Sequence, residues 1–210
     1  QIKISSDFFI ELVPVRKVGG PKEAENITDL SYSHVNYIKR KVKSQKILDE
    51  IKIAKSFCHA CGCYGAESYI NGFSGYSLEL LVYHYKSFMK FIKEMIKVKD
   101  KLVIDMEKQF RNKKEVLLDL NESKLQSPVI LIDPTFKNRN ALAALSEETF
   151  EKFKKASKSF IKSPSLAAFE VKRTDLEKVE KDALKKRYEF ILMEATTNKP
   201  AGDVAGSKLM

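Results

Sequence analysis

The sequence predicts an α+β protein in which helices and strands occupy different stretches of the chain. Apolar residues recur at helical spacing in three long segments, runs rich in β-branched residues lie outside them, and no internal repeat is visible. The longest strand candidate covers residues 8–18 and is ended by Gly19 and Gly20. A second, apolar throughout and closed by proline, covers residues 128–134, and a short strand is predicted at 102–104.

The three predicted helices follow from apolar residues spaced by three and four. The first covers residues 46–60. The second begins after Ser74, whose hydroxyl suits an N-cap, and runs to about residue 96. The third begins at Ser146, which precedes two glutamates that suit the positive end of a helix dipole. From Ala167 onward the pattern predicts a strand, a charged helix and another strand.

Composition narrows the class of protein. A hydrophobic fraction of 43% in 210 residues allows a sizeable core. A net charge of +10 favours an anionic partner, of which nucleic acid is the first candidate, although a lysine-rich surface that serves only solubility explains the charge equally well. No apolar run reaches the ~18 residues of a membrane span, and no secretory signal is visible. A cytoplasmic protein that does not contact a membrane is expected.

Glu11 is a carboxylate inside an apolar strand pattern. An unpaired charge is costly to bury, so exposure at a sheet edge is the simplest explanation. A metal ligand is the alternative, because Pro14 marks the end of the strand pattern, where such ligands lie. One residue does not decide between the two.

Three cysteines crowd into the segment Cys58-His59-Ala60-Cys61-Gly62-Cys63. An odd number of cysteines is not a disulfide framework and suits a reducing compartment. Thiolate and imidazole are preferred zinc ligands, but no second pair of Cys or His follows at ligand spacing. We therefore expect the cysteines to pack beside a tight turn and expect no zinc.

The most specific run in the chain is Gly72-Phe-Ser-Gly-Tyr-Ser-Leu-Glu-Leu-Leu81. Two glycines flank a serine at a predicted helix start, where free backbone N–H groups bind phosphate. Close packing of helices would use the same residues, so the run by itself leaves both explanations open.

Several segments together resemble the archaeal-type (class I) CCA-adding enzymes, template-independent polymerases that add C, C and A to the 3′ end of tRNA. They follow one another in the family's order and span well over half the chain. The segments are Phe9-Ile-Glu11-Leu-Val-Pro14, Asp29-Leu-Ser-Tyr-Ser-His34-Val-Asn-Tyr37-Ile, Gly62-Cys-Tyr64-Gly65-Ala-Glu67, the Gly72 to Leu81 run, and Ile130-Leu-Ile-Asp133-Pro134 through Arg139-Asn140-Ala141. Poly(A) polymerases share the Gly-Phe-x-Gly helix start, whereas the Tyr-Gly-Ala-Glu run and the Arg-Asn segment favour the CCA-adding branch.

The resemblance implies roles for five residues. Glu11 would be the third catalytic carboxylate and a metal ligand. His34, Lys55 and Tyr64 would contact the incoming nucleotide, and Arg139 would help to recognise its base. The residue types suit these roles, because lysine is a point charge for phosphate, tyrosine stacks or donates, and arginine offers a planar fork of donors.

RNA binding is predicted for basic segments outside these positions. The basic stretch Lys39-Arg40-Lys41, Lys43 and Lys46 and the helix near residues 152–158 are expected to contribute to tRNA binding, with a strength that falls with salt through counterion release. The expected partners are the tRNA 3′ end, CTP and ATP, and a homodimer is kept as one option for the oligomeric state.

The chain also departs from the family's pattern. Glu11 stands where the family usually has Asp, and Phe136 stands near the place of a second Asp after Asp133-Pro134. The family's first two carboxylates and its Gly-Ser motif would lie before Gln1, and both ends look like cuts through a longer protein. Three carboxylates would hold two Mg²⁺ ions in the whole enzyme, so the chain by itself is expected to be inactive.

The resemblance also implies a division into three domains. Residues 1–27 would end the nucleotidyltransferase catalytic domain with the last strand of its palm. Residues 28–165 would form a mostly helical central domain that binds nucleotide and tRNA, and residues 166–210 would begin a C-terminal RNA-binding α/β domain.

Two other functions stay open. One is a non-catalytic RNA-binding subunit or degenerate paralogue of the same superfamily, and the other is a poly(A)-polymerase-like enzyme. A Gly-Ser motif followed by a pair of acidic residues, encoded in frame upstream of Gln1, would favour the CCA-adding enzyme over the subunit.

Overall fold

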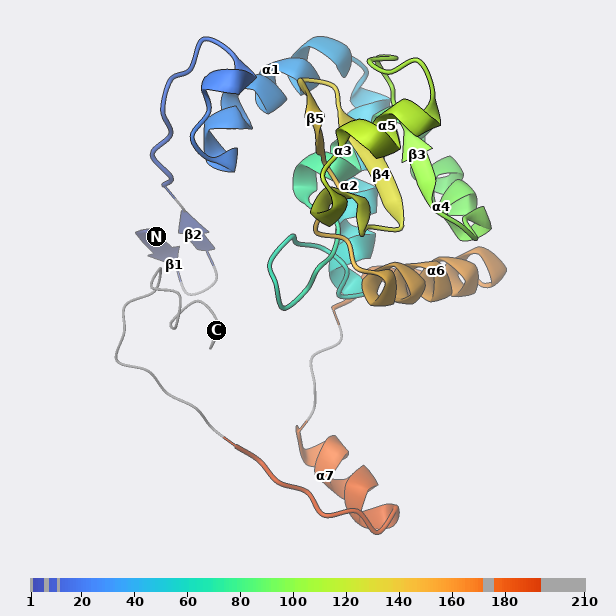
Figure 1. Cartoon of the computed structure of the whole chain (residues 1–210). Helices are drawn as coiled ribbons and strands as arrows, with labels where there is room; N and C mark the ends of the chain where they lie inside the picture. The colour runs from blue at the N-terminus through green and yellow to red at the C-terminus, as the bar shows by residue number, and fades with distance from the viewer. Residues whose placement is uncertain (1, 6–7, 11, 172–175, 194–210) are drawn as a thin grey trace. The chain divides into compact units, whose positions relative to one another are not determined.

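The computed structural model describes residues 2–5, 8–10, 12–171 and 176–193. They belong to two compact units, each described here by itself. The smaller unit comprises residues 1–14 and 172–210. Within it, β1 (Ile2–Ser5) pairs antiparallel with β2 (Phe8–Ile10), and α7 covers Leu176–Lys185 (Figure 1).

The larger unit, residues 15–171, contains most of the regular structure. In chain order its elements are α1 (Ser31–Lys41), α2 (Gln45–Ala60), α3 (Gly75–Tyr85), α4 (Phe88–Lys97), β3 (Leu102–Ile104), α5 (Lys113–Asp119), β4 (Val129–Asp133), β5 (Phe136–Asn140) and α6 (Glu147–Lys162). Short 3-10 turns are η1 (Pro21–Glu23), η2 (Ile27–Leu30), η3 (Glu122–Leu125) and η4 (Leu166–Phe169). The predicted α+β class is confirmed, and the predicted domain boundaries stay predictions.

The central strand of the sheet, β4, is buried on both faces. It pairs in parallel with β3 and antiparallel with β5. Val129 and Leu131 pack in the main core with the helices, whereas Ile130 and Ile132 pack in a second cluster with residues of and near α5. Burial on both faces explains why this segment reads as an uninterrupted apolar run and not as an alternating one.

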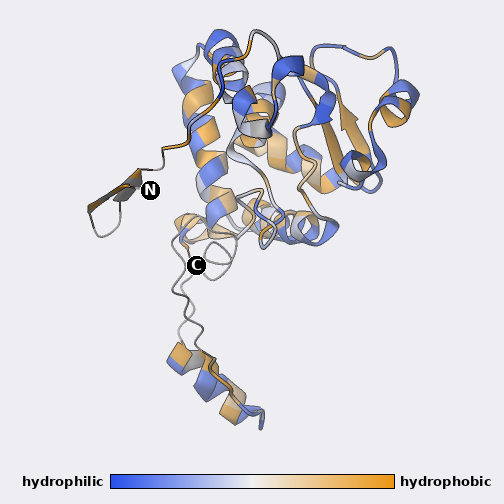
Figure 2. Ribbon diagram, turned by 60° about the vertical axis from the view of Figure 1, so that its left-hand side comes forward, coloured by the Kyte–Doolittle hydropathy of each residue, from blue (hydrophilic) through white to orange (hydrophobic). Residues whose placement is uncertain are grey.

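The main core contains an aromatic cluster contributed by α2, α4, α6 and the loop before α3. The rings of Phe57, Phe73, Phe91 and Phe153 are at most 1% exposed, and the centroids of Phe73 and Phe153 lie 4.8 Å apart. Figure 2 shows the consequence for the helices, which carry hydrophobic residues beside hydrophilic ones along their length. Phe57 alone contacts rings from α4, α6 and η4, so one side chain ties three elements together.

The cysteine segment packs as predicted. Cys58 and Cys63 are fully buried and belong to the main core, while Cys61 is half-buried. Gly62 between them has a φ of 62°, a left-handed conformation that glycine adopts at little cost. Burial, reinforced by the neighbouring Cys63, raises the pKa of the Cys58 thiol.

Two predicted elements are wrong in extent. The strand predicted over residues 8–18 is regular only as β2, and residues 12–18 have no regular structure because Leu12 and Val15 are exposed and find no partner strand among the described residues. The helix predicted from Ser74 to residue 96 is two helices. Lys86 has a left-handed φ of 67° and ends α3, and Ser87 then accepts a hydrogen bond from the Lys90 N–H and caps α4.

Other elements were not predicted or lie elsewhere. Helices α1 and α5 lack a long apolar stripe, and they form because they pack against larger elements. The strand predicted after Ala167 is the 3-10 turn η4, and the predicted charged helix is α7. The second strand predicted there is absent from residues 186–193, and its remainder lies outside the described residues. The described helices are all too short or too polar to cross a membrane.

The tight packing before α3 makes Gly72 sensitive to substitution. A Cβ atom at Gly72 would lie 2.2 Å from the backbone oxygen of Cys63, which cannot move without breaking the loop. We expect Gly72→Ala to lower the free energy of unfolding by about 1–3 kcal/mol, as overpacking does. Urea denaturation measures this change. Gly20→Ala is the matched control, because nothing lies within 4 Å of the added methyl group, and an equal loss in both variants would contradict the argument.

Candidate functional site

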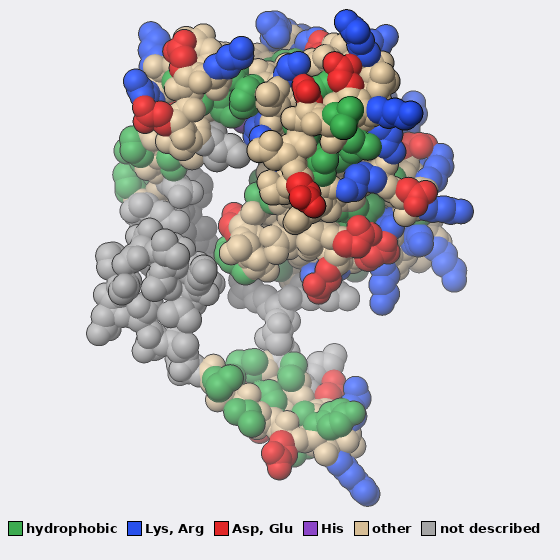
Figure 3. All heavy atoms as spheres, in the orientation of Figure 1, with side chains coloured by type: hydrophobic (Ala, Val, Ile, Leu, Met, Phe, Trp, Pro, Cys, Tyr) green, Lys and Arg blue, Asp and Glu red, His purple; other side chains and the backbone are tan. Residues whose placement is uncertain are grey.

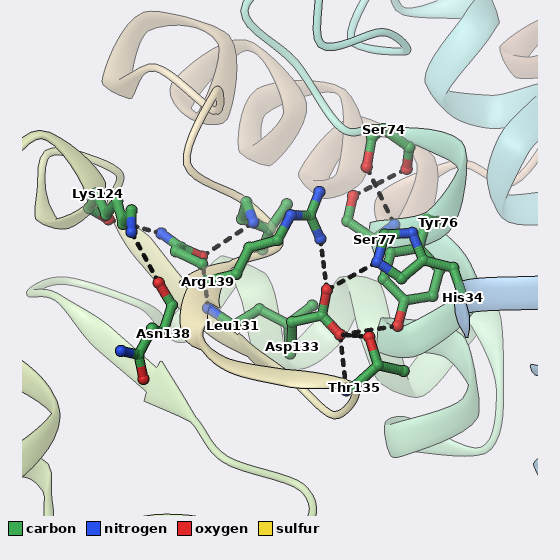
Figure 4. A network of polar contacts seen from close by, with 12 residues as sticks. His34, Ser74, Tyr76, Ser77, Lys124, Leu131, Asp133, Thr135, Asn138 and Arg139 are labelled. Carbon is green, nitrogen blue, oxygen red and sulfur yellow. Dashed lines mark hydrogen bonds and ion pairs between the residues drawn. The ribbon is translucent and has the colours of Figure 1, made fainter. Parts of the chain in front are cut away.

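Asp133, the last residue of β4, is a fully buried carboxylate that accepts hydrogen bonds from three other elements (Figure 4). Its Oδ2 accepts from His34 Nε2 of α1 at 3.0 Å and from an Arg139 guanidinium N–H of β5 at 2.6 Å. Its Oδ1 accepts from the Tyr76 hydroxyl of α3 at 3.1 Å. In the turn after β4, the Thr135 N–H and hydroxyl donate to the same oxygen, at 2.8 and 2.7 Å.

These contacts keep Asp133 ionised. Burial by itself would raise the pKa of Asp133, because it disfavours the charged form. The hydrogen bond and charge of His34, together with the hydrogen bonds from Thr135, act in the opposite direction and hold the pKa well below its usual range. Burial makes the largest contribution to raising the pKa of Tyr76, and the negative charge of Asp133 makes the next largest. At neutral pH Asp133 is therefore an acceptor and Tyr76 a protonated donor.

The side chains that meet Asp133 also pack against one another. The rings of His34 and Tyr76 are stacked, with centroids 3.9 Å apart and planes 17° apart. The Arg139 guanidinium carbon lies 5.9 Å from the centre of the Tyr76 ring, within range of a cation–π contact. Two predicted nucleotide-contacting residues, His34 and Arg139, are thus brought together through Asp133 and Tyr76. The sequence offers pairing with Asp133 as an alternative role for Arg139, and that ion pair is present.

A second cluster lies on the loop between α2 and α3. Tyr64 forms an isolated bridge with Phe73, so the two ends of the loop run side by side. The Tyr64 ring stacks on His59 with centroids 3.9 Å apart. A methyl group at Gly75 would lie 2.8 Å from the Tyr64 hydroxyl oxygen and 3.8 Å from Lys55 Nζ, so both polar groups approach the start of α3.

Lys55 is held by an ion pair. The Nζ atom of Lys55 lies 2.7 Å from Oε1 of Glu79, which follows Gly75 by one turn of α3. The Lys55 side chain is 30% exposed. The ammonium group is therefore positioned, and part of the Lys55 side chain stays exposed. Glu79 belongs to the glycine-rich run, but it lies 24 positions after Lys55 on another helix, so no local spacing in the sequence indicates this pairing.

Both clusters converge on the first turn of α3. Tyr76 joins the Asp133 cluster, and Gly75 is approached by Lys55 and Tyr64. Ser74 caps the helix by accepting from the Ser77 N–H at 3.1 Å, as the sequence predicts. The remaining N–H groups of the first turn have no intrahelical acceptor and favour an anion. Cationic and hydrogen-bonding side chains from α1, α2, the loop and β5 thus surround a helix N-terminus.

Arg139 also lines a cavity of about 370 Å³ on the residue 21–30 side of β5. Its Nε is buried and has no hydrogen-bond partner among the described residues. The cavity is bounded by Pro21, Lys22, Ala24, Glu25, Asn26, Leu30, Lys124, Phe136, Asn138, Arg139, Asn140 and Ala143. Asn140, next to Arg139, has a structural task, since its Oδ1 accepts from the N–H groups of Leu131 and Leu142, both at 2.9 Å.

The predicted RNA-binding stretch forms the last turn of α1. Lys39 and Arg40 are exposed, but Lys41 pairs with Glu107 at 2.7 Å. Glu107 also accepts a hydrogen bond from the buried hydroxyl of Tyr37. Only part of the positive charge predicted for this stretch is therefore unpaired, and RNA binding by these residues stays a prediction.

Glu11, the predicted catalytic carboxylate and metal ligand, lies outside the described residues, so the structure does not test its role. Within the part of the chain that the structure describes, no three His, Cys, Asp or Glu side chains are grouped so that they could hold a metal ion. Asp133 does not substitute for such a group, because both of its oxygens are engaged by donors.

Comparison with known proteins identifies the family of this chain. The family described as tRNA nucleotidyltransferase, second domain, matches residues 49–170, which is more than half of the chain. The chain belongs to the tRNA nucleotidyltransferase family. The matched residues include Lys55, Tyr64, Asp133 and Arg139, whereas His34 lies before them.

Individual relatives are archaeal CCA-adding enzymes, which confirms the resemblance found in the sequence. The chain is 43% identical over 141 residues to the CCA-adding enzyme of Nanoarchaeum equitans, a match that covers 67% of the chain and 36% of that protein. It is 32% identical over 162 residues to the enzyme of Thermococcus gammatolerans, covering 76% of the chain and 35% of that protein. For Saccharolobus shibatae the identity is 31% over 175 residues, with 83% and 39% covered. The chain thus spans between one third and two fifths of the length of these relatives.

The pH dependence of the free energy of unfolding tests the role of Asp133 in this site. Because its folded-state pKa is lower than the unfolded value of about 3.9, the unfolded chain binds the proton first as the pH falls. The stability that Asp133 contributes is present above that pH and is lost as the pH drops toward its folded-state pKa. We expect Asp133→Asn to lower the free energy of unfolding by about 3–5 kcal/mol at pH 7, the usual cost of breaking a buried ion pair, and by clearly less at pH 3.

Urea denaturation at the two pH values measures both effects. Asp119→Asn is the control, since Asp119 is a half-exposed carboxylate that lies 3.6 Å from Lys137 and should change stability by less than about 1 kcal/mol. A loss at Asp133 that is equal at both pH values would show that the carboxylate charge is not what holds the cluster.

Proposed function

We propose that this chain forms the nucleotide-binding part of a CCA-adding enzyme that transfers CMP and AMP to the 3′ end of tRNA without a nucleic-acid template. The observation that supports this most directly is the convergence of His34, Lys55, Tyr64 and Arg139 near one turn of α3. Membership of the family and the similarity to archaeal CCA-adding enzymes support the same activity.

The triphosphate would bind at the start of α3. Lys55 supplies a positive charge beside Gly75, and Tyr64 supplies a hydroxyl group at the same place. The N–H groups of the first helical turn add donors that favour an anion. A methyl group at Gly75 would lie 2.8 Å from the Tyr64 hydroxyl oxygen, so Tyr64 would have to move away from the start of α3 to accommodate it.

His34 would contact the sugar or the phosphates through its other ring nitrogen. Since Asp133 is ionised, His34 Nε2 carries a proton and donates to it, which leaves Nδ1 facing elsewhere. In the neutral ring Nδ1 accepts from a sugar hydroxyl, and in the protonated ring it donates to a phosphate. By accepting the hydrogen bond from Nε2, Asp133 would orient the His34 ring toward the nucleotide without contacting the nucleotide itself.

Arg139 would recognise the base. Asp133 holds one guanidinium nitrogen, while the buried Nε has no partner among the described residues. The adjoining cavity of about 370 Å³ lies at the small end of the range for ligand sites and suits one base better than a whole nucleotide. Asn26 and Asn138 also line it and offer donors and acceptors that C and A would meet differently.

The proposal that the whole enzyme uses Mg²⁺ rests only on the resemblance to CCA-adding enzymes. Mg²⁺ prefers oxygen ligands, which Glu11 would supply. The described residues do not fit a metal ion, because their one buried site carboxylate is fully engaged by donors. The contribution of the described residues is therefore to bind and orient the nucleotide.

We expect the 210-residue chain to bind CTP and ATP but to add no nucleotide to tRNA that lacks CCA. The resemblance identifies a single catalytic carboxylate in it, whereas the transfer requires carboxylates for two metal ions. Isothermal titration calorimetry measures the binding, and incorporation of labelled CMP measures the transfer. Incorporation by the purified chain would disprove the assignment of catalysis to carboxylates outside it, and absence of binding would remove the nucleotide site.

Lys55 and Arg139 should affect nucleotide binding in different ways. Lys55→Ala removes a charge that meets the triphosphate, which CTP and ATP share. A charge-assisted contact contributes about 1.5–3 kcal/mol, so the affinities for CTP and ATP should both fall by roughly tenfold to a hundredfold. Arg139→Ala should change the ratio of the two affinities, and Arg139→Lys should not restore it because a point charge cannot replace a planar fork.

Matched variants separate these effects from loss of folding. Lys52→Ala alters the same helix at an exposed lysine paired with Asp49 and should leave both affinities unchanged. Arg139→Ala also removes a partner of Asp133, so its thermal stability has to be measured beside its affinities. A destabilised Arg139 variant with an unchanged ratio of CTP to ATP affinity would mean that Arg139 serves only the Asp133 cluster.

A further inference from the structure

His59 is an exposed histidine on the last turn of α2, and neither the core nor the proposed nucleotide contacts use it. Its neighbours Phe57 and Cys58 are buried in the main core. Because His59 follows Lys55 by four residues, the two side chains lie on one face of the helix. From this face His59 reaches Tyr64, and Lys55 approaches the start of α3.

The His59 ring lies almost flat against the Tyr64 ring. Their centroids are 3.9 Å apart and their planes 22° apart, so the imidazole covers one face of the phenol. The bridge between Tyr64 and Phe73 fixes the backbone at this point, but it does not by itself fix the side-chain torsions of Tyr64. The stack restricts those torsions and thereby sets the direction of the hydroxyl group.

The direction set in this way brings the Tyr64 hydroxyl to the start of α3. A methyl group added at Gly75 would lie 2.8 Å from the hydroxyl oxygen and 3.7 Å from the ring carbon that bears it. The same methyl group would lie 3.8 Å from Lys55 Nζ. Since His59 covers one face of the Tyr64 ring and the ring also packs against the main core, Tyr64 presents its hydroxyl to a ligand at this place.

A second stack of a histidine on a tyrosine contributes to the same turn of α3. The centroids of His34 and Tyr76 are also 3.9 Å apart, and Tyr76 lies in the first turn of the helix. The chain contains three histidines, so two of the three stack on a tyrosine at the start of α3. Stacking on histidine is therefore a repeated feature of this site, and His59 shares it with His34.

A basic residue in the last turn of a helix also suits the negative end of the helix dipole, which is the simplest other explanation for His59. That explanation needs a charge and no ring. Figure 3 shows many lysine and arginine side chains on the surface of the larger unit, so positive charge is not scarce there. The flat ring that lies against Tyr64 is what distinguishes His59 from those side chains.

We propose that His59 is a positioning residue, which holds the Tyr64 hydroxyl beside Gly75 and Lys55 and thereby strengthens the binding of a nucleoside triphosphate. His59 acts through Tyr64 and does not itself contact the nucleotide. The identity of the ligand rests on the proposed function, whereas the effect of His59 on Tyr64 rests on the stack.

Titration calorimetry of CTP and ATP with the 210-residue chain tests the effect on binding. His59→Ala removes the stack and should weaken both affinities by about threefold to tenfold, which is the usual contribution of an aromatic pair. His59→Phe keeps a ring against Tyr64, so its affinities should stay within about twofold of those of the unmodified chain. Both variants remove the histidine from the end of α2. Equal losses in the two variants, or no loss in His59→Ala, would overturn the proposal.

Two further variants show whether His59 acts through Tyr64. In a chain that already carries Tyr64→Leu, His59→Ala should weaken CTP binding no further, because the ring that His59 positions is gone. A second loss of the same size would mean that His59 contacts the nucleotide directly, which contradicts the proposal. Tyr69→Ala is the matched control, since the Tyr69 side chain lies on the same loop and is 68% exposed. It should leave the affinity unchanged, and a loss equal to that of His59→Ala would also count against a specific role of the stack.

Nuclear magnetic resonance separates this proposal from the proposed function, because it needs no nucleotide. The Hα signals of Gly75 report the position of the Tyr64 phenol, which lies next to Gly75. His59→Ala should shift these signals in the direction that Tyr64→Leu does, and His59→Phe should leave them nearly in place. Unshifted Gly75 signals in His59→Ala would disprove the positioning role. A chain that binds neither CTP nor ATP, but whose Gly75 signals respond as expected, would disprove the proposed function and retain the role of His59 in placing Tyr64.

Discussion

The buried carboxylate of Asp133 is the group on which the candidate site depends. An unpaired charge at a fully buried position costs several kcal/mol, so the fold has to supply hydrogen-bond donors to it. They come from α1, α3, β5 and the turn after β4. The same requirement fixes the side chains that donate, and for this reason His34, Tyr76 and Arg139 share one position in the molecule.

The first turn of α3 is the second constraint, and it depends on small residues. Gly72 lets the loop pass close to the Cys63 backbone, and Gly75 lets Tyr64 and Lys55 approach the helix. Ser74 caps the helix and thereby sets where the free N–H groups lie. Of the two uses that its sequence suggests, the glycine-rich run serves close packing at Gly72. Gly75 and Ser74 shape the end of the helix at which phosphate binding is proposed.

The positive charge of the chain has several separate uses. Lys55 is held against Glu79 beside the start of α3, and Lys41 is neutralised by Glu107. Most of the lysines that line a groove between α4 and α6 form no ion pair among the described residues. A net charge of +10 does not distinguish among these cases, because pairing depends on which acidic residues the fold brings near each lysine.

The sequence by itself determined the elements whose signals are local. The apolar run of β4, the caps Ser74 and Ser146 and the stripes of α2 and α6 were all predicted, because burial and capping act on residues a few positions apart. The break at Lys86 was missed because a continuous apolar stripe hides a turn between two helices that pack on the same core. Likewise, the family resemblance identified His34, Lys55, Tyr64 and Arg139 as candidates but not what holds them.

Only the tertiary structure decided how those candidates are arranged. His34 and Asp133 are 99 positions apart, and their contact depends on how α1 packs beside the end of β4. Similarly, Lys90 and Lys158 border one groove only because α4 packs on α6. Such pairings depend on how whole elements pack around the main core, and they cannot be predicted from the local spacing of residues.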